Sequence, residues 1–482
     1  MLFLLMAGEG VACYTVSNRP RGGVWVSASC RNGLITFMQG LTVGKIFKFW
    51  LPLAGTWLMM SAEGPFIAAI IARHTDPKFN LAAYGVAFSF ALIIEAPVIM
   101  MMTASTSLVK NSQSLSKLRQ FTWALNISIT LLMLVLLRPK VFSLITINAM
   151  NLPQYVADLT YTATVILLPW PAAIGIRRFY QGVLIANHAT RRVTYGTFVR
   201  LISMGSTALI LKQFPGTPGV YIGAAALSAG VTVEAIFTRI MVHSILKKVS
   251  SRDAGPGKAP LGFGKISRFY YPLALTSMLT LGVHPLITFF IGKSAMAVDS
   301  LAVLPVVGSF VFIFRGVGMS FQEAAITLMG KNKDDDRLVT RFATVLGLSL
   351  AAGLVIIALT PLSRIWFIQV SGLKPELASM ALTPLLIMGV FPSLTVLISF
   401  QRALLVRKGK TSPITLATII EVSMILLVLY LAIIQFRIVG VTAATMAFLS
   451  GRVAANLYLY VQLKILSRKV IPPPAAGRSS IG

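Results

Sequence analysis

The sequence predicts an all-α membrane protein with twelve transmembrane helices in two homologous six-helix bundles. Three observations lead to this fold class. First, 56% of the 482 residues are hydrophobic and only 12% are charged, whereas a soluble protein carries about a quarter charged residues. Second, apolar runs long enough to cross a bilayer recur along the chain. Third, an entry motif appears twice, with its prolines at Pro52 and Pro272, which are 220 positions apart.

The spans follow from runs of about 17–25 predominantly apolar residues, the length that an α-helix needs to cross a bilayer. The predicted spans are 47–71, 81–108, 119–137, 155–176, 193–211, 219–245, 269–291, 301–329, 342–359, 377–402, 414–436 and 439–465. Between them, Lys and Arg gather in the loops on one side, among them Arg177, Arg178, Arg191 and Arg192. Because positive loops are retained in the cytoplasm, we expect a plasma (inner) membrane protein with both termini cytoplasmic.

The formal net charge of +29 follows from the same topology. In a soluble protein it would favour nucleic-acid binding. Here most of it falls in loops beside the cytoplasmic leaflet, where anionic lipids attract basic segments. We therefore expect the lipid bilayer as a partner and no nucleic acid.

The entry motif reads "FKFWLPLA" at 47–54 and "RFYYPLAL" at 268–275. At the same offset of 220, residues 179–204 align with 399–424 without gaps. In each copy the basic residue lies by the headgroups, an aromatic residue marks the membrane interface, and the proline falls in the first helical turn. Because six spans per copy is an even number, both copies enter from the same side. The two bundles are therefore related by a pseudo-twofold axis along the membrane normal, with the substrate site between them.

The repeat also gives the predicted domain boundaries. Residues 1–37 form a poorly ordered or misassigned leader, 38–248 the N-terminal bundle, 249–265 a cytoplasmic linker rich in Gly and Pro, 266–470 the C-terminal bundle, and 471–482 a tail. The sequence shows no metal-binding motif and no catalytic set, so we expect neither an enzyme nor a cofactor. Secondary transport coupled to H⁺ or Na⁺ is the favoured function.

Charged residues inside spans are costly and usually functional. Glu63, beside Gly64 and Pro65 in a helix expected to bend, and Glu95 are the candidates for binding the coupling ion. The candidates for the substrate cavity are Arg315, Arg200, Arg452, Glu234 and Glu421.

Glu95 and Arg315 are 220 positions apart and so occupy equivalent places in the two bundles. We expect them to face each other across the cleft as a charge pair that a substrate or ion can break. The alternative is a permanent structural ion pair, or two groups with separate partners. Arg200 and Glu421 also lie in equivalent regions, and Arg452 lies in the span that matches that of Glu234.

The strings "FWLPLA" and "FYYPLAL", with "LAAYGVAFSF" at 81–90, resemble the progressive ankylosis protein family. That family belongs to the superfamily of multidrug and toxin extrusion (MATE) transporters, polysaccharide flippases and lipid II flippases. The resemblance covers about residues 40–470 and implies a MATE-like fold, alternating access and export of a small anion such as an organic acid, pyrophosphate or a nucleotide. It also implies coupling through a first-helix carboxylate, which here is Glu63.

Two other functions remain open within the same superfamily. One is an H⁺- or Na⁺-coupled antiporter for drugs and cations, and the other is a flippase for lipid-linked precursors. Cation exporters favour acidic cavities, whereas Arg200, Arg315 and Arg452 make this cavity mixed or basic. We therefore expect a monomer that binds a small anionic substrate.

Overall fold

The computed structural model describes residues 41–187, 189–214, 216–252, 261–329, 333–408, 410 and 412–468. Within them every element is a helix. The predicted leader and tail, and residues 253–260 of the predicted linker, lie outside the described residues. The described parts of the predicted linker at either side are partly helical.

The first half of the chain contains α2 (Val43–Ser61), α3 (Glu63–Ala72), α4 (Pro77–Glu95), α5 (Met101–Leu108), α6 (Ser112–Leu136), α7 (Pro139–Ser143), the π-helix η1 (Leu144–Ala149), α8 (Gln154–Ile166), α9 (Pro169–Ala186), α10 (Thr190–Leu211), α11 (Gly219–Met241) and α12 (His243–Ser250). The second half contains α13 (Phe263–Gly292), α14 (Ala297–Met319), α15 (Phe321–Leu328), α16 (Lys333–Leu359), α17 (Leu362–Arg364), the π-helix η2 (Ile365–Val370), α18 (Pro375–Ile387), the 3₁₀-helix η3 (Met388–Val390), α19 (Phe391–Arg407), α20 (Ser412–Leu429), the π-helix η4 (Tyr430–Gln435) and α21 (Gly440–Arg468).

Local sequence explains several helix ends. The Thr42 side chain accepts a hydrogen bond from the Lys45 backbone N–H at the start of α2, and Asn111 forms a capping box with Ser114 at the start of α6. Proline occupies the first turn of α4, α9 and α18, where its missing N–H has no helical partner to lose. Caps of this kind satisfy backbone groups that the helix itself leaves unpaired.

Ten helical segments of the described chain are long and apolar enough to cross a membrane. They overlap ten of the twelve predicted spans. The other two predicted spans correspond to α10 and α21, which are 22 and 29 residues long but are not among the ten. Both helices carry charged side chains of the candidate site described below.

The two halves repeat the same order of elements at an offset of 220–221. The π-helices η1 and η2 begin at Leu144 and Ile365, which are 221 positions apart. Left-handed backbone conformations recur at the same spacing. They lie at Asp76 and Met296, at Asn151 and Gly372, and at Gly216 and Arg437. Since such conformations are uncommon outside glycine, their recurrence indicates that the repeat found in the sequence is also a structural one.

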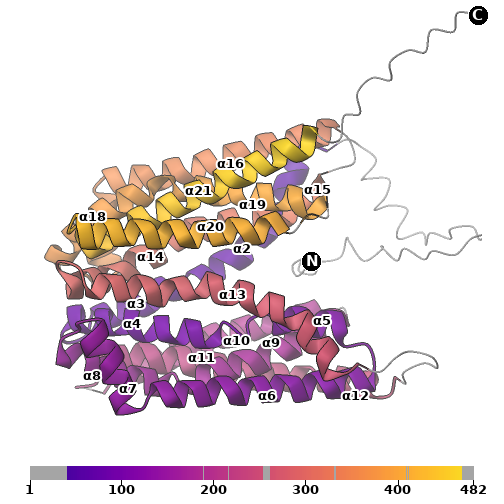
Figure 1. Ribbon diagram of the computed structural model, residues 1–482, viewed down its shortest axis with the longest axis horizontal. Helices are drawn as coiled ribbons and strands as arrows, with labels where there is room; N and C mark the ends of the chain where they lie inside the picture. Colours follow the sequence, from indigo (N-terminus) through magenta and orange to yellow (C-terminus); the bar gives the residue numbers. More distant parts are fainter. Residues whose placement is uncertain are drawn as a thin grey trace, which may run out of the picture.

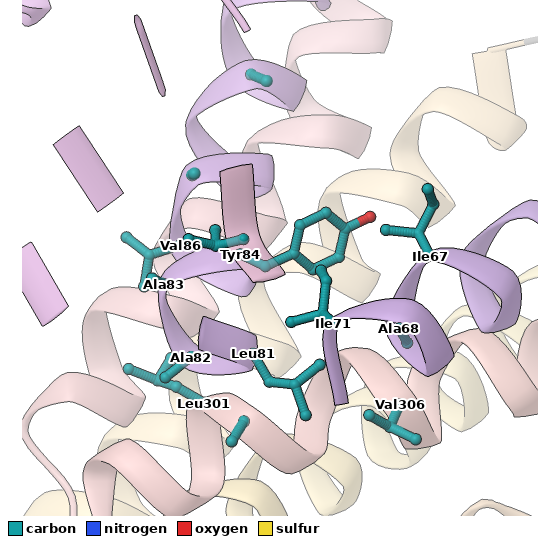
Figure 2. Packing of buried hydrophobic residues seen from close by; sticks show 14 of the residues in the cluster. Ile67, Ala68, Ile71, Leu81, Ala82, Ala83, Tyr84, Val86, Leu301 and Val306 are labelled. Carbon is teal, nitrogen blue, oxygen red and sulfur yellow. The ribbon is translucent and has the colours of Figure 1, made fainter. Parts of the chain in front are cut away.

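We call the end of the molecule where α2 begins, α12 ends and α13 begins the near end, and the opposite end, where α3 ends and α4 begins, the far end. At the far end one hydrophobic core joins the two halves. Figure 2 shows part of it, where Ile67 and Ile71 of α3 and Leu81 of α4 pack close to Leu301 and Val306 of α14. The far end of the protein is thus a single packed body.

At the near end, apart from a small cluster among α19, α20 and α21, the hydrophobic core divides into two separate clusters. One cluster belongs to the first half but includes Ile266 and Tyr270 of α13. The other belongs to the second half but includes Ile46 and Trp50 of α2. Figure 1 shows the same exchange, with the indigo α2 running among the orange helices of the second half and α13 running beside α4. The first helix of each half therefore packs on the opposite half.

A hydrogen bond from the entry motif of each half holds its first helix on the opposite half. Trp50 Nε1 donates a hydrogen bond of 2.8 Å to Ser320 Oγ in the second half. Tyr270, 220 positions later, donates a hydrogen bond from its hydroxyl group to the Pro97 carbonyl in the first half. Both rings are buried, with exposed fractions of 6% and 3%. Trp50 and Tyr270 are thus buried anchors between the halves. The expectation that the proline of this motif falls in the first helical turn is wrong, because Pro52 and Pro272 lie well inside α2 and α13.

Close helix packing repeats as well. A Cβ added to Gly230 of α11 would lie 3.3 Å from the Arg200 carbonyl oxygen of α10. A Cβ added to Gly451 of α21 would lie 2.8 Å from the Glu421 carbonyl oxygen of α20. Each pair of positions is separated by 221 residues, and the backbone approaches so closely that only glycine fits at position 451 without movement.

We predict that Gly451→Ala lowers the free energy of unfolding by about 1–3 kcal/mol, as overpacking of a close contact usually does. Gly230→Ala should lower the free energy of unfolding by less, because a Cβ added there lies farther from its neighbours. Gly55→Ala is the matched control, since a Cβ there meets nothing within 4 Å. Thermal unfolding of the purified variants in detergent measures the difference, and equal stability of the Gly451 and Gly55 variants would contradict the packing argument.

Candidate functional site

Glu63 lies at the break between the first two helices. The helical path is interrupted at Ala62, and α3 begins at Glu63. The bend predicted for Glu63, Gly64 and Pro65 is therefore present as a break. Gly64 faces the other half, because a Cβ at this position would lie 2.8 Å from Ser309 Cβ of α14. The carboxylate is buried, with an exposed fraction of 7%.

Glu63 is one end of a chain of charges across four helices. It forms an ion pair with Arg200 of α10, and Arg200 Nη1 lies 4.0 Å from Glu234 Oε2 of α11. Glu234 in turn forms an ion pair with Arg177 of α9 and accepts a 3.1 Å hydrogen bond from Gln181 Nε2. Because buried charges are stable only when paired and hydrogen-bonded, this chain fixes α3, α9, α10 and α11 relative to one another.

The position of Arg177 and Arg178 corrects the sequence analysis. Both were assigned to a loop on the cytoplasmic side, after a span ending at 176. The structure instead places them in the middle of α9, where Arg177 is 5% exposed. Arg178 Nη1 lies 3.9 Å from Met102 Sδ of α5. Arg177 and Arg178, which were expected among the loop charges that set the orientation in the membrane, are thus part of the charged interior of the first half.

Glu95 is the last residue of α4 and is 4% exposed. The cations that act on its carboxylate are Arg178, Arg177 and Arg200. No ion pair joins it to another described residue, and its Oε2 has no protein partner. With Glu63, Glu95 and Glu234 against Arg177, Arg178 and Arg200, the first half contains a balanced set of three acids and three bases, which we call the N-set.

The second half contains a set of different composition. Arg452 Nη2 of α21 lies 2.8 Å from Glu421 Oε1 of α20. The Arg315 guanidinium of α14 lies 4.6 Å from the centre of the Phe391 ring, and that of Arg452 lies 5.1 Å from the same ring. Arg402 of α19 interacts electrostatically with Arg452 and Glu421. We call Arg315, Arg402, Arg452 and Glu421 the C-set.

The C-set has a surplus of positive charge. It contains three arginines and one glutamate, and the glutamate is paired with Arg452. Within the described residues Arg315 and Arg402 take part in no ion pair, and the Nε of each is buried without a protein partner. Ring faces offset part of the cost of a buried guanidinium. They do not replace a counter-ion.

The two sets are related by the repeat with the signs exchanged. Arg200 of the N-set and Glu421 of the C-set are 221 positions apart. Arg200 forms ion pairs with Glu63 of α3 and Glu234 of α11. Glu421 forms one with Arg452 of α21. The base is on α10 and the acid on α11 in the first half, whereas the acid is on α20 and the base on α21 in the second.

The predicted pair of Glu95 and Arg315 does not form in this conformation. No ion pair joins them, and the charges that act on each belong to its own half: three arginines for Glu95, and Arg452 and Glu421 for Arg315. Within the described residues neither takes part in any ion pair, and each lies in the charge set of its own half. The other candidates come together within their halves, Glu63 with Arg200 and Glu234, and Glu421 with Arg452.

Four polar residues of the site were not among the sequence candidates: Arg177, Arg178, Gln181 and Arg402. A signal for three of them was present. The predicted span 377–402, shifted back by the repeat offset of 220, covers 157–182 and so includes Arg177, Arg178 and Gln181. Only the apolar run ending at Ile176 argued for the shorter span.

The charged side chains of the two sets are suited to binding ions. Within the described residues no group of three or more His, Cys, Asp or Glu side chains is placed to hold a metal ion. The unpaired guanidiniums of the C-set are suited to binding carboxylate or phosphate oxygens. The carboxylates of the N-set are suited to binding a proton or a small cation.

Comparison with solved structures decides the fold. An inward-facing MATE-family multidrug resistance transporter of the MOP superfamily matches 86% of this chain and 96% of its own, with a TM-score of 0.66 and 14% identity. The lipid II flippase MurJ in an inward closed conformation matches 85% and 86%, with a TM-score of 0.64 and 13% identity. The chain has a MATE-like fold.

An outward-facing MATE-family transporter of the MOP superfamily matches 91% of the chain and 99% of its own at 14% identity, with a lower TM-score of 0.58. No family model matches the sequence, and no curated protein matches it. Together with the ten long apolar helices, the MATE-like fold makes the chain an integral multi-pass membrane protein.

The Arg177–Glu234 pair generates a stability prediction. Arg177→Met alone should lower the free energy of unfolding by about 3–5 kcal/mol, because it leaves a buried carboxylate without its main counter-charge. Arg177→Met combined with Glu234→Gln should recover much of that loss, since neither change then leaves an isolated charge. Thermal unfolding in detergent completes the double-mutant cycle, and additive losses in the double variant would contradict a direct pair.

Proposed function

We propose that this protein is a secondary active transporter that works by alternating access and exports a small anion, with coupling to H⁺ or Na⁺. The observation that carries the proposal is the unbalanced C-set. Arg315 and Arg402 are half-buried, the Nε of each is buried without a protein partner, and no carboxylate of the described chain forms an ion pair with either. A buried charge without a counter-ion is unstable, and a bound anion supplies that counter-ion.

The size of the surplus favours a multivalent anion. Three arginines against one glutamate leave two positive charges. A substrate of the organic acid, pyrophosphate or nucleotide class carries two or more negative charges and presents several oxygens to planar guanidiniums. A monovalent cation or a cationic drug would meet repulsion at the same place.

The membrane arrangement that we propose has twelve spans in two six-helix bundles, with α10 and α21 as the fifth and twelfth spans. The near end then lies at the cytoplasmic side of the plasma (inner) membrane, together with both termini. The repeated elements and the structural likenesses support this arrangement. Within the superfamily we propose the progressive ankylosis family as the relative, on the entry motifs quoted above, and a monomer as the working unit.

The conformation supports an inward-facing state. The halves share one hydrophobic core at the far end, whereas among the described residues of the near end their cores are separate, and each includes residues of the other half's first helix, α2 or α13. The higher TM-score against the inward-facing MATE structure than against the outward-facing one agrees with this.

The N-set supplies the coupling site in this proposal. Glu63 lies at the helix break, contacts Arg200, and is next to Gly64, which packs against the other half. A proton or Na⁺ on Glu63 would compete with Arg200 for the carboxylate. The charge chain from α3 to α9 would then rearrange when the coupling ion binds.

For the anion site, we predict that Arg315→Ala and Arg402→Ala each lower anion transport about tenfold or more, because each removes a charged donor whose hydrogen bonds are worth about 1.5–3 kcal/mol. Arg315→Lys should retain part of the activity, since Lys keeps the charge but loses the planar fork. Uptake of labelled citrate and pyrophosphate into inverted vesicles measures this.

The matched control is Arg341→Ala, an exposed arginine on α16 of the same half. It should transport at the wild-type rate. If the wild type moves a cationic dye but no anion, the anion proposal is wrong and the drug antiporter takes its place. Transport of a lipid-linked precursor alone would likewise favour the flippase.

For coupling, we predict that Glu63→Gln abolishes gradient-driven transport while expression and folding stay near normal. The amide keeps the size of the side chain but neither titrates nor carries charge. Anion uptake is compared with and without an imposed H⁺ or Na⁺ gradient in the same vesicles. A variant that still responds fully to the gradient would exclude Glu63 as the coupling residue.

A further inference from the structure

Arg73 joins the two halves at the far end. It directly follows α3, which ends at Ala72. Its Nη2 donates hydrogen bonds to the carbonyl oxygens of Gln369 at 2.6 Å and of Val370 at 2.8 Å, both in the other half. Its Nη1 donates to the Ala69 carbonyl in its own helix at 2.8 Å. One guanidinium thus holds the end of α3 against the end of η2.

The two carbonyls are the last of the π-helix η2, which ends at Val370. The last carbonyls of a helix have no partner within it, and they form the negative end of the helix dipole. A guanidinium donates hydrogen bonds to these carbonyls and also places a positive charge at the negative end of the dipole. The chain beyond η2 is also shaped around the arginine. Gly372 has a φ of +76°, and a Cβ there would lie 2.9 Å from Arg73 Cγ.

The repeat provides an internal comparison. Lys293 follows α13 at the position equivalent to Arg73, since the two are 220 positions apart. Its ammonium lies 4.5 Å from the centre of the Phe289 ring on its own helix. Within the described residues no hydrogen bond or ion pair joins it to the first half. The backbones still meet there, because a Cβ at Gly292 would lie 2.3 Å from the Met150 carbonyl oxygen.

Other charges at the far end add little to the closure. Lys78 Nζ lies 2.8 Å from Asp299 Oδ1 of the other half, but the lysine side chain is 40% exposed, and solvent-exposed pairs are weak. The pKa of His74, next to Arg73, is lowered by burial and further by the nearby Lys212. Arg73 is exposed as well, but unlike Lys78 it donates two hydrogen bonds to the other half at once.

We propose that Arg73 is a one-sided latch that holds the far end closed and must release the η2 carbonyls before that end opens. The ends of α3 and α13 each approach the chain just past a π-helix of the other half, at Gly372 and at Met150. Of the two, only the end of α3 adds charged hydrogen bonds among the described residues. Opening therefore has a directed first step, the separation of α3 from η2. The inference rests on the alternating-access part of the proposed function and is independent of the substrate.

The test measures the distance between the two halves in the purified full-length protein. Cysteines replace Gln154 at the start of α8 and Glu376 in the first turn of α18, both exposed at the far end, and Cys13 and Cys30 are changed to Ser. Spin labels on the introduced cysteines report the distance distribution by pulsed electron resonance in lipid nanodiscs. The variants are Arg73→Ala, Arg73→Lys and, as the matched control, Lys293→Ala.

We expect Arg73→Ala to increase the population with a longer distance about tenfold, because the charge-assisted bonds exist only in the closed state. Arg73→Lys should give a smaller increase, and Lys293→Ala should match the wild type. Equal distributions for Arg73→Ala and wild type, or equal shifts for the Arg73 and Lys293 variants, would overturn the latch. The distance measurement does not use transport, so its result can be interpreted even if the proposed substrate or coupling ion is wrong.

Discussion

The interior of this protein is governed by the cost of burying charge among apolar helices. A guanidinium or carboxylate removed from water must find an opposite charge or hydrogen-bond partners. The N-set meets this requirement within the protein, through pairs that join α3, α9, α10 and α11. The C-set meets it only for Arg452. The positions of the long helices in each half follow from these pairs, and the unmet part defines where a ligand is needed.

Packing at the two ends explains how such a site is reached. A shared core fixes the far end, whereas the near-end cores meet only through α2 and α13, each docked on the opposite half by Trp50 or Tyr270. These two helices connect both ends, because α2 continues through the break at Ala62 into α3, which carries Glu63 at its start and is followed by Arg73. Glu63 and Arg73 therefore lie at the start and just past the end of one helix, so a movement of α3 displaces both.

Much of this could be predicted from the sequence, because hydropathy and an offset of 220 are properties of the chain itself. The spans, the repeat and the break at Glu63 fall in this class. The interior positions of Arg177 and Arg178 could not be read from hydropathy, because the partner of Arg177 is Glu234, 57 residues away, and a buried arginine at the end of an apolar run looks like a loop arginine. The anchoring roles of Trp50 and Tyr270 could not be predicted for a similar reason, because their partners, Ser320 and Pro97, lie far along the chain.

The sign exchange between Arg200 on α10 and Glu421 on α20 has an evolutionary consequence. A tandem duplication first produces identical halves, and each half here still keeps the same glycine contact between its last two long helices. The halves can no longer stand in for each other, however. Two copies of the first would combine six acids with six bases, whereas two copies of the second would combine six guanidiniums with two carboxylates. In charge, the duplicated halves thus behave as two different subunits joined in one chain.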